Sequence, residues 1–173
     1  MSQTVLITGA SNGIGKACAR VFARKGYDLV LVARHREKLD AVKAELSEYD
    51  VQIKVIAMDL TGEDAAVDLY NNLVLDDISI DILVNNAGFG DHGAFHDSSW
   101  EKQKKMVLLN IVALMQMTYV FGQSMKRRKK GRILNVASIA GLCAGPYMST
   151  YYATKAFVLS FSESIAYELK DYN

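Results

Sequence analysis

The 173-residue chain is poor in the residue types that mark several classes of protein. It has one proline, Pro146, and therefore no proline-rich linker between domains. Its two cysteines, Cys18 and Cys143, are too few for a disulfide framework or a cysteine-only zinc site, which favours a reducing, cytoplasmic location. No spacing of ligand residues is typical of a metal site, and we expect no bound metal.

The sequence also lacks a surplus of either charge. Lys and Arg number 20 and Asp and Glu number 19, so no overall field attracts nucleic acid or an anionic membrane. The most apolar stretch, 107–117, is interrupted by Asn110 and Gln116. Half of the residues are hydrophobic and 23% are charged, which is typical of a folded globular protein. We expect a single domain over residues 1–173 that binds a small molecule, with no nucleic-acid partner and no membrane partner.

Short apolar runs alternate with segments of helical periodicity along the chain. We expect strands over 5–7, 29–32, 53–58, 80–84 and 133–136. We expect helices from Ile14 to Gly26, over 37–49, from a cap at Thr61 to residue 75, from a capping box of Ser98 and Glu101 to the basic run 126–132, and over 150–169. Continuously apolar strands separated by helices predict an α/β fold with a doubly wound parallel sheet in three α/β/α layers, whose ligands bind at the carboxyl ends of the strands.

Three glycines, Gly9, Gly13 and Gly15, lie between the first strand and the first helix. They let the backbone approach a pyrophosphate, whose charge the amino end of the helix would stabilise. A tight turn could also use them for purely structural reasons, since their spacing differs from the common dinucleotide pattern.

The end of the second strand carries Arg34 where an NAD site would need a carboxylate for the ribose 2′-hydroxyl. A guanidinium pairs well with a 2′-phosphate, so this position favours NADP. The alternative is that Arg34 and Arg36 are solvated charges at the start of a helix, although the helix dipole disfavours cations there.

Polar residues also follow the third and fourth strands. Asp59 could accept a hydrogen bond from an adenine amino group, or it could cap the next helix. The motif Asn85, Asn86, Ala87 and Gly88 places two amides and a glycine at a buried strand end, where they can line the floor beneath a cofactor.

Ser138 follows the fifth strand, and Tyr151 and Lys155 come on the last helix. Residues four apart share one helix face, so the Lys155 ammonium would favour the phenolate form of Tyr151 and make it a general acid or base. Tyr152 is a rival phenol that lies about a hundred degrees around the helix.

Taken together and in this order, the motifs resemble those of the short-chain dehydrogenase/reductase family. The resemblance covers nearly the whole chain. It implies a Rossmann-type domain that transfers hydride between a nicotinamide ring and a carbonyl or alcohol. Ser138 would polarise the substrate oxygen, Tyr151 would exchange its proton, and Lys155 would promote the phenolate and hold the nicotinamide ribose.

The resemblance also implies that Asn110 supports a water-linked proton relay to Lys155, whereas its apolar surroundings alone would suggest a satisfied core amide. The expected catalytic residues are Asn110, Ser138, Tyr151 and Lys155. The expected cofactor-binding residues are Gly9, Ser11, Asn12, Gly13, Ile14, Gly15, Arg34, Asp59, Leu60, Asn86, Ala87, Gly88, Tyr151 and Lys155.

Weaker signals lie in two loops and at one helix end. His92 and His96 could touch a substrate, and the apolar segment 142–148 should line its pocket, with Cys143 as a wall residue and not a nucleophile. The basic run 126–132 is better interpreted as the end of a helix than as a nucleic-acid site.

Members of the family usually continue beyond this last helix, so we expect the domain to be C-terminally incomplete. Two functions of different class stay open. The first is an NADP-dependent oxidoreductase with Tyr151 as acid/base. The second is a non-catalytic cofactor-binding or dimerisation module that results from truncation. The resemblance implies, under both, a homo-oligomer that pairs through its two long C-terminal helices.

Overall fold

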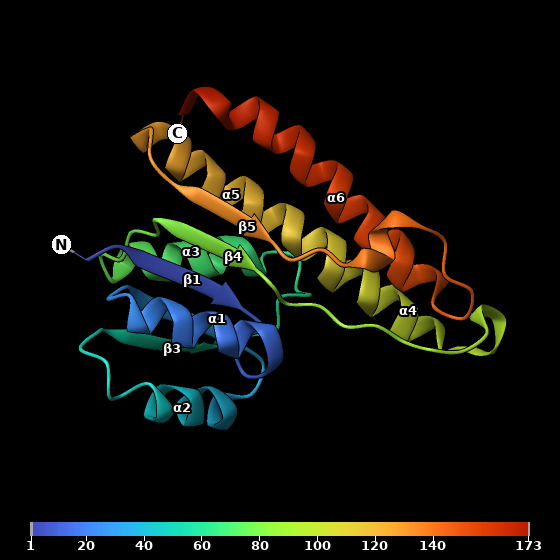
Figure 1. The fold of residues 1–173 in the computed structure, drawn as a ribbon, viewed down its shortest axis with the longest axis horizontal. Coiled ribbons are helices and arrows are strands. Elements are labelled where there is room, and N and C mark those ends of the chain that lie inside the picture. Colours follow the sequence, from blue (N-terminus) through green and yellow to red (C-terminus); the bar gives the residue numbers. More distant parts are fainter. Residues whose placement is uncertain (1, 173) are drawn as a thin grey trace.

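Five parallel strands form one sheet in the computed structural model, which describes residues 2–172 (Figure 1). They are β1 (Thr4–Thr8), β2 (Asp28–Ala33), β3 (Ile53–Ala57), β4 (Ile82–Asn85) and β5 (Arg132–Asn135), in the spatial order β3-β2-β1-β4-β5. The chain first adds strands on one side of β1 and then, from β4 on, adds them on the other side. This change of direction in strand order confirms the predicted doubly wound parallel sheet. The ends of the expected domain, Met1 and Asn173, lie outside the described residues.

Helices cover both faces of this sheet (Figure 1). They are α1 (Gly13–Arg24), α2 (Arg36–Glu45), α3 (Ala65–Leu75), α4 (Trp100–Val107), α5 (Leu114–Arg128) and α6 (Ser149–Leu169). Side chains of α1 and α2 share one buried cluster with the sheet, and those of α3 and α5 share a second cluster on the other face. With α6 lying alongside α5, the result is the three-layer arrangement expected from the sequence.

The apolar runs of β1, β2 and β4 form strands because both faces of the sheet are buried there, whereas the edge strands β3 and β5 are only partly buried. Val5, Leu6 and Ile7 have no exposed surface, and they alternate between the two clusters. Burying each such side chain contributes about 1.5–3 kcal/mol, so the central strands anchor both helical layers.

Two predicted helix starts are wrong by a few residues. Thr61 does not cap a helix, because its N–H and hydroxyl both donate to Asp59 and α3 begins only after Asp64. The cap of α4 is Ser99, whose Oγ accepts the N–H of Lys102, whereas Ser98 donates to Phe95 O. The adjacent hydroxyls explain the second error, since either one fits the capping pattern.

The long helix expected up to the basic run is not uniform. A π-helical segment, Leu108–Ala113, lies between α4 and α5 and contains Asn110. π segments widen a helix locally and occur often at functional sites. The combined run Trp100–Arg128 contains an 18-residue stretch, of mean hydropathy 1.4, that could cross a membrane by length and composition. In this fold Met117, Phe121 and Met125 of the run pack in the buried cluster on one face of the sheet.

The basic run ends α5 as predicted. Lys129 takes the left-handed conformation that terminates the helix, with φ +50°. Arg128 and Lys130 reach Asp81 at 3.5 and 3.3 Å, so part of the positive charge is neutralised within the fold.

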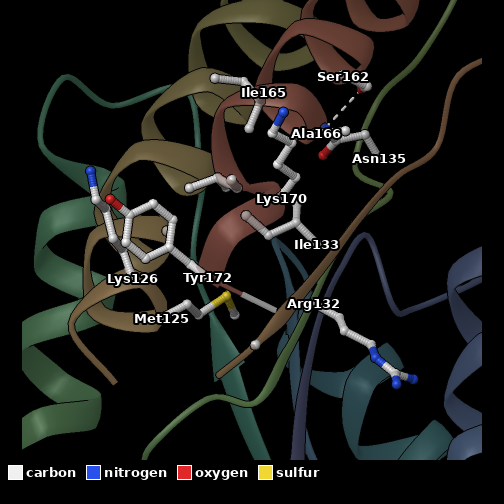
Figure 2. A pocket seen from close by; sticks show the side chains of 13 residues that line it. Met125, Lys126, Arg132, Ile133, Asn135, Ser162, Ile165, Ala166, Lys170 and Tyr172 are labelled. Atoms are coloured by element: carbon white, nitrogen blue, oxygen red, sulfur yellow. Dashed lines mark hydrogen bonds between the residues drawn. The ribbon is translucent and has the colours of Figure 1, made fainter. Parts of the chain in front are cut away.

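A groove of about 270 Å³ lies between the end of α5, β5 and the end of α6 (Figure 2). On one side of the groove Asn135 Nδ2 donates to Ser162 Oγ. On the opposite side Lys126 Nζ lies 4.7 Å from the ring centroid of Tyr172. Because Arg132, the first residue of β5, lines it, the groove extends toward the amino end of that strand and away from the predicted site.

Candidate active site

The loop after β1 is tied to the end of β4 by two side chains. Thr8 Oγ1 accepts the N–H groups of Asn86 and Ala87, each at 3.0 Å. Asn86 Nδ2 donates to Thr8 O at 2.9 Å and to Gly9 O at 3.2 Å. These bonds fix the glycine loop at the point where the strand order reverses, which is where doubly wound sheets bind ligands.

Close contacts require two of the three predicted glycines. A Cβ on Gly15 would lie 2.4 Å from Gly9 O and 2.5 Å from Asn86 Nδ2. Gly9 has φ +65°, and a Cβ there would lie 2.9 Å from Ala87 Cα. Gly13 has φ +52° and open space around it, so it is needed for the turn alone. The loop therefore presents bare backbone before α1.

The amino end of α1 is open to an anion. Asn12 precedes the helix with an extended backbone, and its side chain makes no capping hydrogen bond. The first turn holds no acidic residue, and Ile14 is 61% exposed. The positive end of the helix dipole and its unpaired N–H groups thus face solvent beside Ser11, as a phosphate site requires.

The two arginines after β2 differ in their partners. Arg36 Nε lies 3.0 Å from an Asp40 carboxylate oxygen one helical turn on. Arg34 is exposed and makes no hydrogen bond or ion pair with any other residue of 2–172. The charge of Arg34 helps to lower the pKa of Asp59, and its guanidinium is available at this edge of the sheet to meet an anionic ligand.

Asp59 anchors a turn and does not cap α3. Its Oδ1 accepts the N–H of Thr61 at 3.0 Å and the Thr61 hydroxyl at 2.9 Å, and the backbone bond is the main reason that the pKa of Asp59 lies below its usual value. Its other oxygen makes no hydrogen bond within the described residues. The Leu60 side chain is 6% exposed in the core, so only its backbone could meet a cofactor.

Asn110 joins the loop after β4 to α6. The side chain is 2% exposed, its Oδ1 accepts Phe89 N–H at 3.1 Å, and its Nδ2 donates to Phe89 O at 2.9 Å and to Thr154 Oγ1 at 3.1 Å. Thr154 in turn donates to Tyr151 O at 2.7 Å. The amide is thus satisfied in the core, and it also fixes the helical turn that carries Tyr151.

Lys155 is a buried cation, 7% exposed. Its Nζ donates to Val136 O at 2.8 Å and lies 5.9 Å from the ring centroid of Tyr151. Burial lowers the pKa of Lys155 below its usual value, since the charged form loses its hydration. A Cβ on Gly88 would lie 3.9 Å from this Nζ, so the motif after β4 borders the lysine.

The two neighbouring phenols point to different surroundings. The Tyr151 ring lies beside the loop after β4, where a Cβ on Gly90 would be 3.1 Å from Tyr151 Cδ2. The Tyr152 ring packs on Gly145, whose Cβ would lie 2.3 Å from Tyr152 Cε2. The ammonium of Lys155 faces the Tyr151 ring, so the structure favours Tyr151 over its rival.

Ser138 lies two residues after the carbonyl that holds Lys155. Its backbone is extended, and its Oγ accepts the N–H of Ala140 at 3.1 Å. That bond orients the hydroxyl and leaves its own hydrogen free for another acceptor. Ser138 and Lys155 are thus both positioned by the segment that directly follows β5.

The loop after β5 lines an open depression of about 640 Å³ together with Tyr152 and Ala153 of α6. Leu142 is 76% exposed there, and Cys143 is an exposed free thiol. Within residues 2–172 no group of three His, Cys, Asp or Glu side chains could hold a metal ion.

Comparison with known proteins identifies this arrangement. The family described as short chain dehydrogenase matches residues 3–173. The chain belongs to the short chain dehydrogenase family. The resemblance to this family that the sequence suggested is thus confirmed.

Individual members of the short chain dehydrogenase family are similar over nearly all of this chain. Very-long-chain 3-oxoacyl-CoA reductase of Coccidioides immitis is 37% identical over 97% of the chain and 49% of its own length. The bulky-bulky ketone specific alcohol dehydrogenase of Comamonas testosteroni is 38% identical, with a TM-score of 0.92 over 99% of this chain and 69% of that one. A short-chain dehydrogenase from Sphingobium yanoikuyae in complex with NADPH is 39% identical, with a TM-score of 0.92 over 98% of this chain and 67% of that one. The chain spans about half the length of the curated relatives that it matches.

Proposed function

We propose that this chain is an NADP(H)-dependent oxidoreductase that interconverts a carbonyl compound and an alcohol, with Tyr151 as the general acid or base. The observation that carries the proposal is the buried ammonium of Lys155 beside the Tyr151 ring, on a helical turn fixed through Asn110. A core helix has no structural need for a buried cation next to a phenol. The solved relative in complex with NADPH supports the choice of cofactor.

The residues present suit a nicotinamide dinucleotide. Gly9, Gly13 and Gly15 with the open end of α1 would hold the pyrophosphate, together with Ser11, Asn12 and Ile14, and Arg34 would hold a 2′-phosphate. Asp59 and the Leu60 backbone would border the adenine, and Asn86, Ala87 and Gly88 the ring end of the molecule. When bound, the nicotinamide supplies or accepts the hydride.

During carbonyl reduction, negative charge develops on the substrate oxygen. The free hydrogen of Ser138 and the phenol of Tyr151 would both donate to that oxygen, and Tyr151 would transfer its proton. Lys155 would stabilise the resulting phenolate, because its ammonium is held close to the ring by Val136 O. Asn110 would hold the loop after β4 against α6 and would support the return of a proton to Lys155.

The free guanidinium of Arg34 leads to a test of cofactor choice. Arg34→Gln should weaken NADPH binding about 10- to 100-fold while changing NADH affinity little, because a hydrogen bond to a charged group contributes about 1.5–3 kcal/mol. Arg36→Gln is the matched control, since Arg36 already pairs with Asp40. Calorimetric titration of both variants with both dinucleotides measures the effect. Equal losses for NADPH and NADH would remove the 2′-phosphate role from Arg34.

The second candidate is a non-catalytic cofactor-binding or dimerisation module. The observation that favours it is that the chain spans 49% of the length of the reductase from Coccidioides immitis. The two candidates differ in hydride transfer and agree in cofactor binding. Under both we place the protein in the cytoplasm, where the free thiols of Cys18 and Cys143 would stay reduced.

We also propose a homo-oligomer that pairs through α5 and α6. These helices share a largely apolar groove of about 390 Å³, lined among others by Met115, Tyr119, Phe161 and Ile165. Tyr119 is 67% exposed there. A large side chain exposed in an apolar patch is typical of a surface that binds another protein. A second copy would cover this face with the same side chains, as a twofold interface requires.

Introducing a charged residue on the α5–α6 face should weaken the association of the subunits. Tyr119→Glu would bury an unpaired carboxylate in the interface, so we expect self-association to weaken at least about 100-fold. Val21→Glu, on the exposed side of α1, is the control and should leave the association unchanged. Sedimentation equilibrium measures both, and a monomeric wild-type chain or an unaffected Tyr119 variant would contradict the proposed interface.

A further inference from the structure

Two loops that flank Tyr151 are cross-linked by contacts that the proposed reaction does not use. The loop after β4 carries His92 and Gly93, and the loop after β5 carries Tyr147. Gly93 N–H donates to Tyr147 O at 2.8 Å. The rings of His92 and Tyr147 stack with centroids 6.1 Å apart and an angle of 27° between their planes. The backbone of Tyr147 and its side chain are therefore both held by the opposite loop.

Tyr147 adopts a backbone conformation that bulky residues rarely take, with φ +62°. Strain of this kind persists only where the surroundings enforce it, and it concentrates at functional sites. Tyr147 is nevertheless 62% exposed. The structure thus fixes an aromatic ring in place while leaving much of its surface open.

Tyr147 lies close to the proposed chemistry along the chain, four residues before Tyr151. Met148, the next residue, reaches the loop after β4, where a Cβ on Gly90 would be 3.3 Å from Met148 Cε and 3.1 Å from Tyr151 Cδ2. Asp91 in the same loop accepts hydrogen bonds from two side chains of α4. The loops beside Tyr151 therefore form a rigid wall, and Tyr147 is an exposed aromatic member of that wall.

We propose that Tyr147, backed by His92, determines substrate specificity by selecting carbonyl compounds that carry a planar aromatic ring on the carbonyl carbon. This inference rests on the proposed function. His92 covers one face of the tyrosine ring and leaves exposed surface for a second ring, and aromatic rings prefer such offset stacking. Because Tyr147 is already immobilised, binding a flat ring would cost little side-chain entropy. A saturated ring of equal size has no such face to offer.

The test compares acetophenone with cyclohexyl methyl ketone, which differ in the planarity of one ring. For Tyr147→Leu, we expect the ratio of kcat/KM for acetophenone to that for cyclohexyl methyl ketone to fall about 3- to 10-fold relative to wild type. Tyr147→Phe keeps the ring and should keep the ratio within about twofold. If the ratio stays unchanged in Tyr147→Leu, even when kcat/KM falls equally for both ketones, the inference is overturned and the proposed function still stands.

If the chain reduces neither ketone, binding tests the inference separately from the proposed function. In that case the affinity of both ketones for the chain with bound NADP⁺ is measured by ligand-observed NMR. Preferential binding of acetophenone that disappears in Tyr147→Leu supports the role of Tyr147. Equal affinities in wild type overturn it.

Discussion

Replacing Tyr151 by Phe should lower kcat by about 10²- to 10⁴-fold, the usual contribution of a general acid or base. The substitution removes one hydroxyl and keeps the ring that packs beside the loop after β4. We therefore expect NADPH to bind still, with a small loss of affinity at most, and the free energy of unfolding to stay the same. Stopped-flow fluorescence for binding, steady-state turnover and urea unfolding measure the three quantities separately.

Tyr152→Phe is the matched control for this prediction. It deletes the same atom one residue later, from a ring that packs on Gly145 and does not face the Lys155 ammonium. Turnover should stay close to that of wild type. If Tyr152→Phe were the variant that lost activity, the assignment of the proton donor would have to move by one residue.

Replacing Gly15 by Ala should impair both folding and cofactor binding. The new Cβ would meet Gly9 O at 2.4 Å and Asn86 Nδ2 at 2.5 Å, so the loop would have to open. Overpacking of this kind costs about 1–3 kcal/mol. Because the displaced backbone is also the proposed pyrophosphate cradle, we expect NADPH affinity to fall at least about tenfold.

The control for Gly15→Ala is Gly13→Asn. Gly13 has a positive φ and open space around it, and asparagine tolerates that conformation. Its stability, from urea unfolding, should lie within about 1 kcal/mol of wild type. Similar losses in the two variants would mean that the loop is sensitive to any side chain, and that close contact with Asn86 is not the cause.

The sequence predicts the sheet well because its strands are short, apolar and separated by clear turns, and the inner strands are buried on both faces. The run 5–7 is apolar at every position, which only a strand covered on both sides tolerates, and β1 is central in the structure. Helix starts were harder. Ser98 and Ser99 are chemically equal candidates for a cap, and only the path of the preceding turn, where Ser98 bonds to Phe95 O, decides between them.

The candidate site could be predicted residue by residue, but its connections could not. Asn110, Tyr151 and Lys155 come from motifs, whereas the bonds that join them pass through Thr154 and the backbone of Phe89. A threonine in a helix carries no signal of that role, since its partner is 44 residues away in sequence. The π segment around Asn110 was equally hidden, because helical periodicity continues on both sides of it.

Close packing reveals a further residue that sequence reasoning missed. Gly90 follows the amide motif and looks like one more turn glycine, yet its missing side chain makes room for the Tyr151 ring and Met148. The same loop supplies His92, which the sequence suggested could touch a substrate and whose ring stacks on Tyr147. Such roles depend on the meeting of two loops 50 or more residues apart, which no local pattern encodes.

Transfer of deuterium tests the proposed function most directly. The 173-residue chain is mixed with NADPH in which both hydrogens at C4 of the nicotinamide are replaced by deuterium and with a panel of ketones that includes acetophenone, and the alcohols are analysed by mass spectrometry. We predict a monodeuterated alcohol from the wild-type chain and a strongly reduced yield from Tyr151→Phe at equal cofactor occupancy. Bound NADPH without deuterium in any product, from wild type and variant alike, would contradict an oxidoreductase and favour a non-catalytic cofactor-binding module.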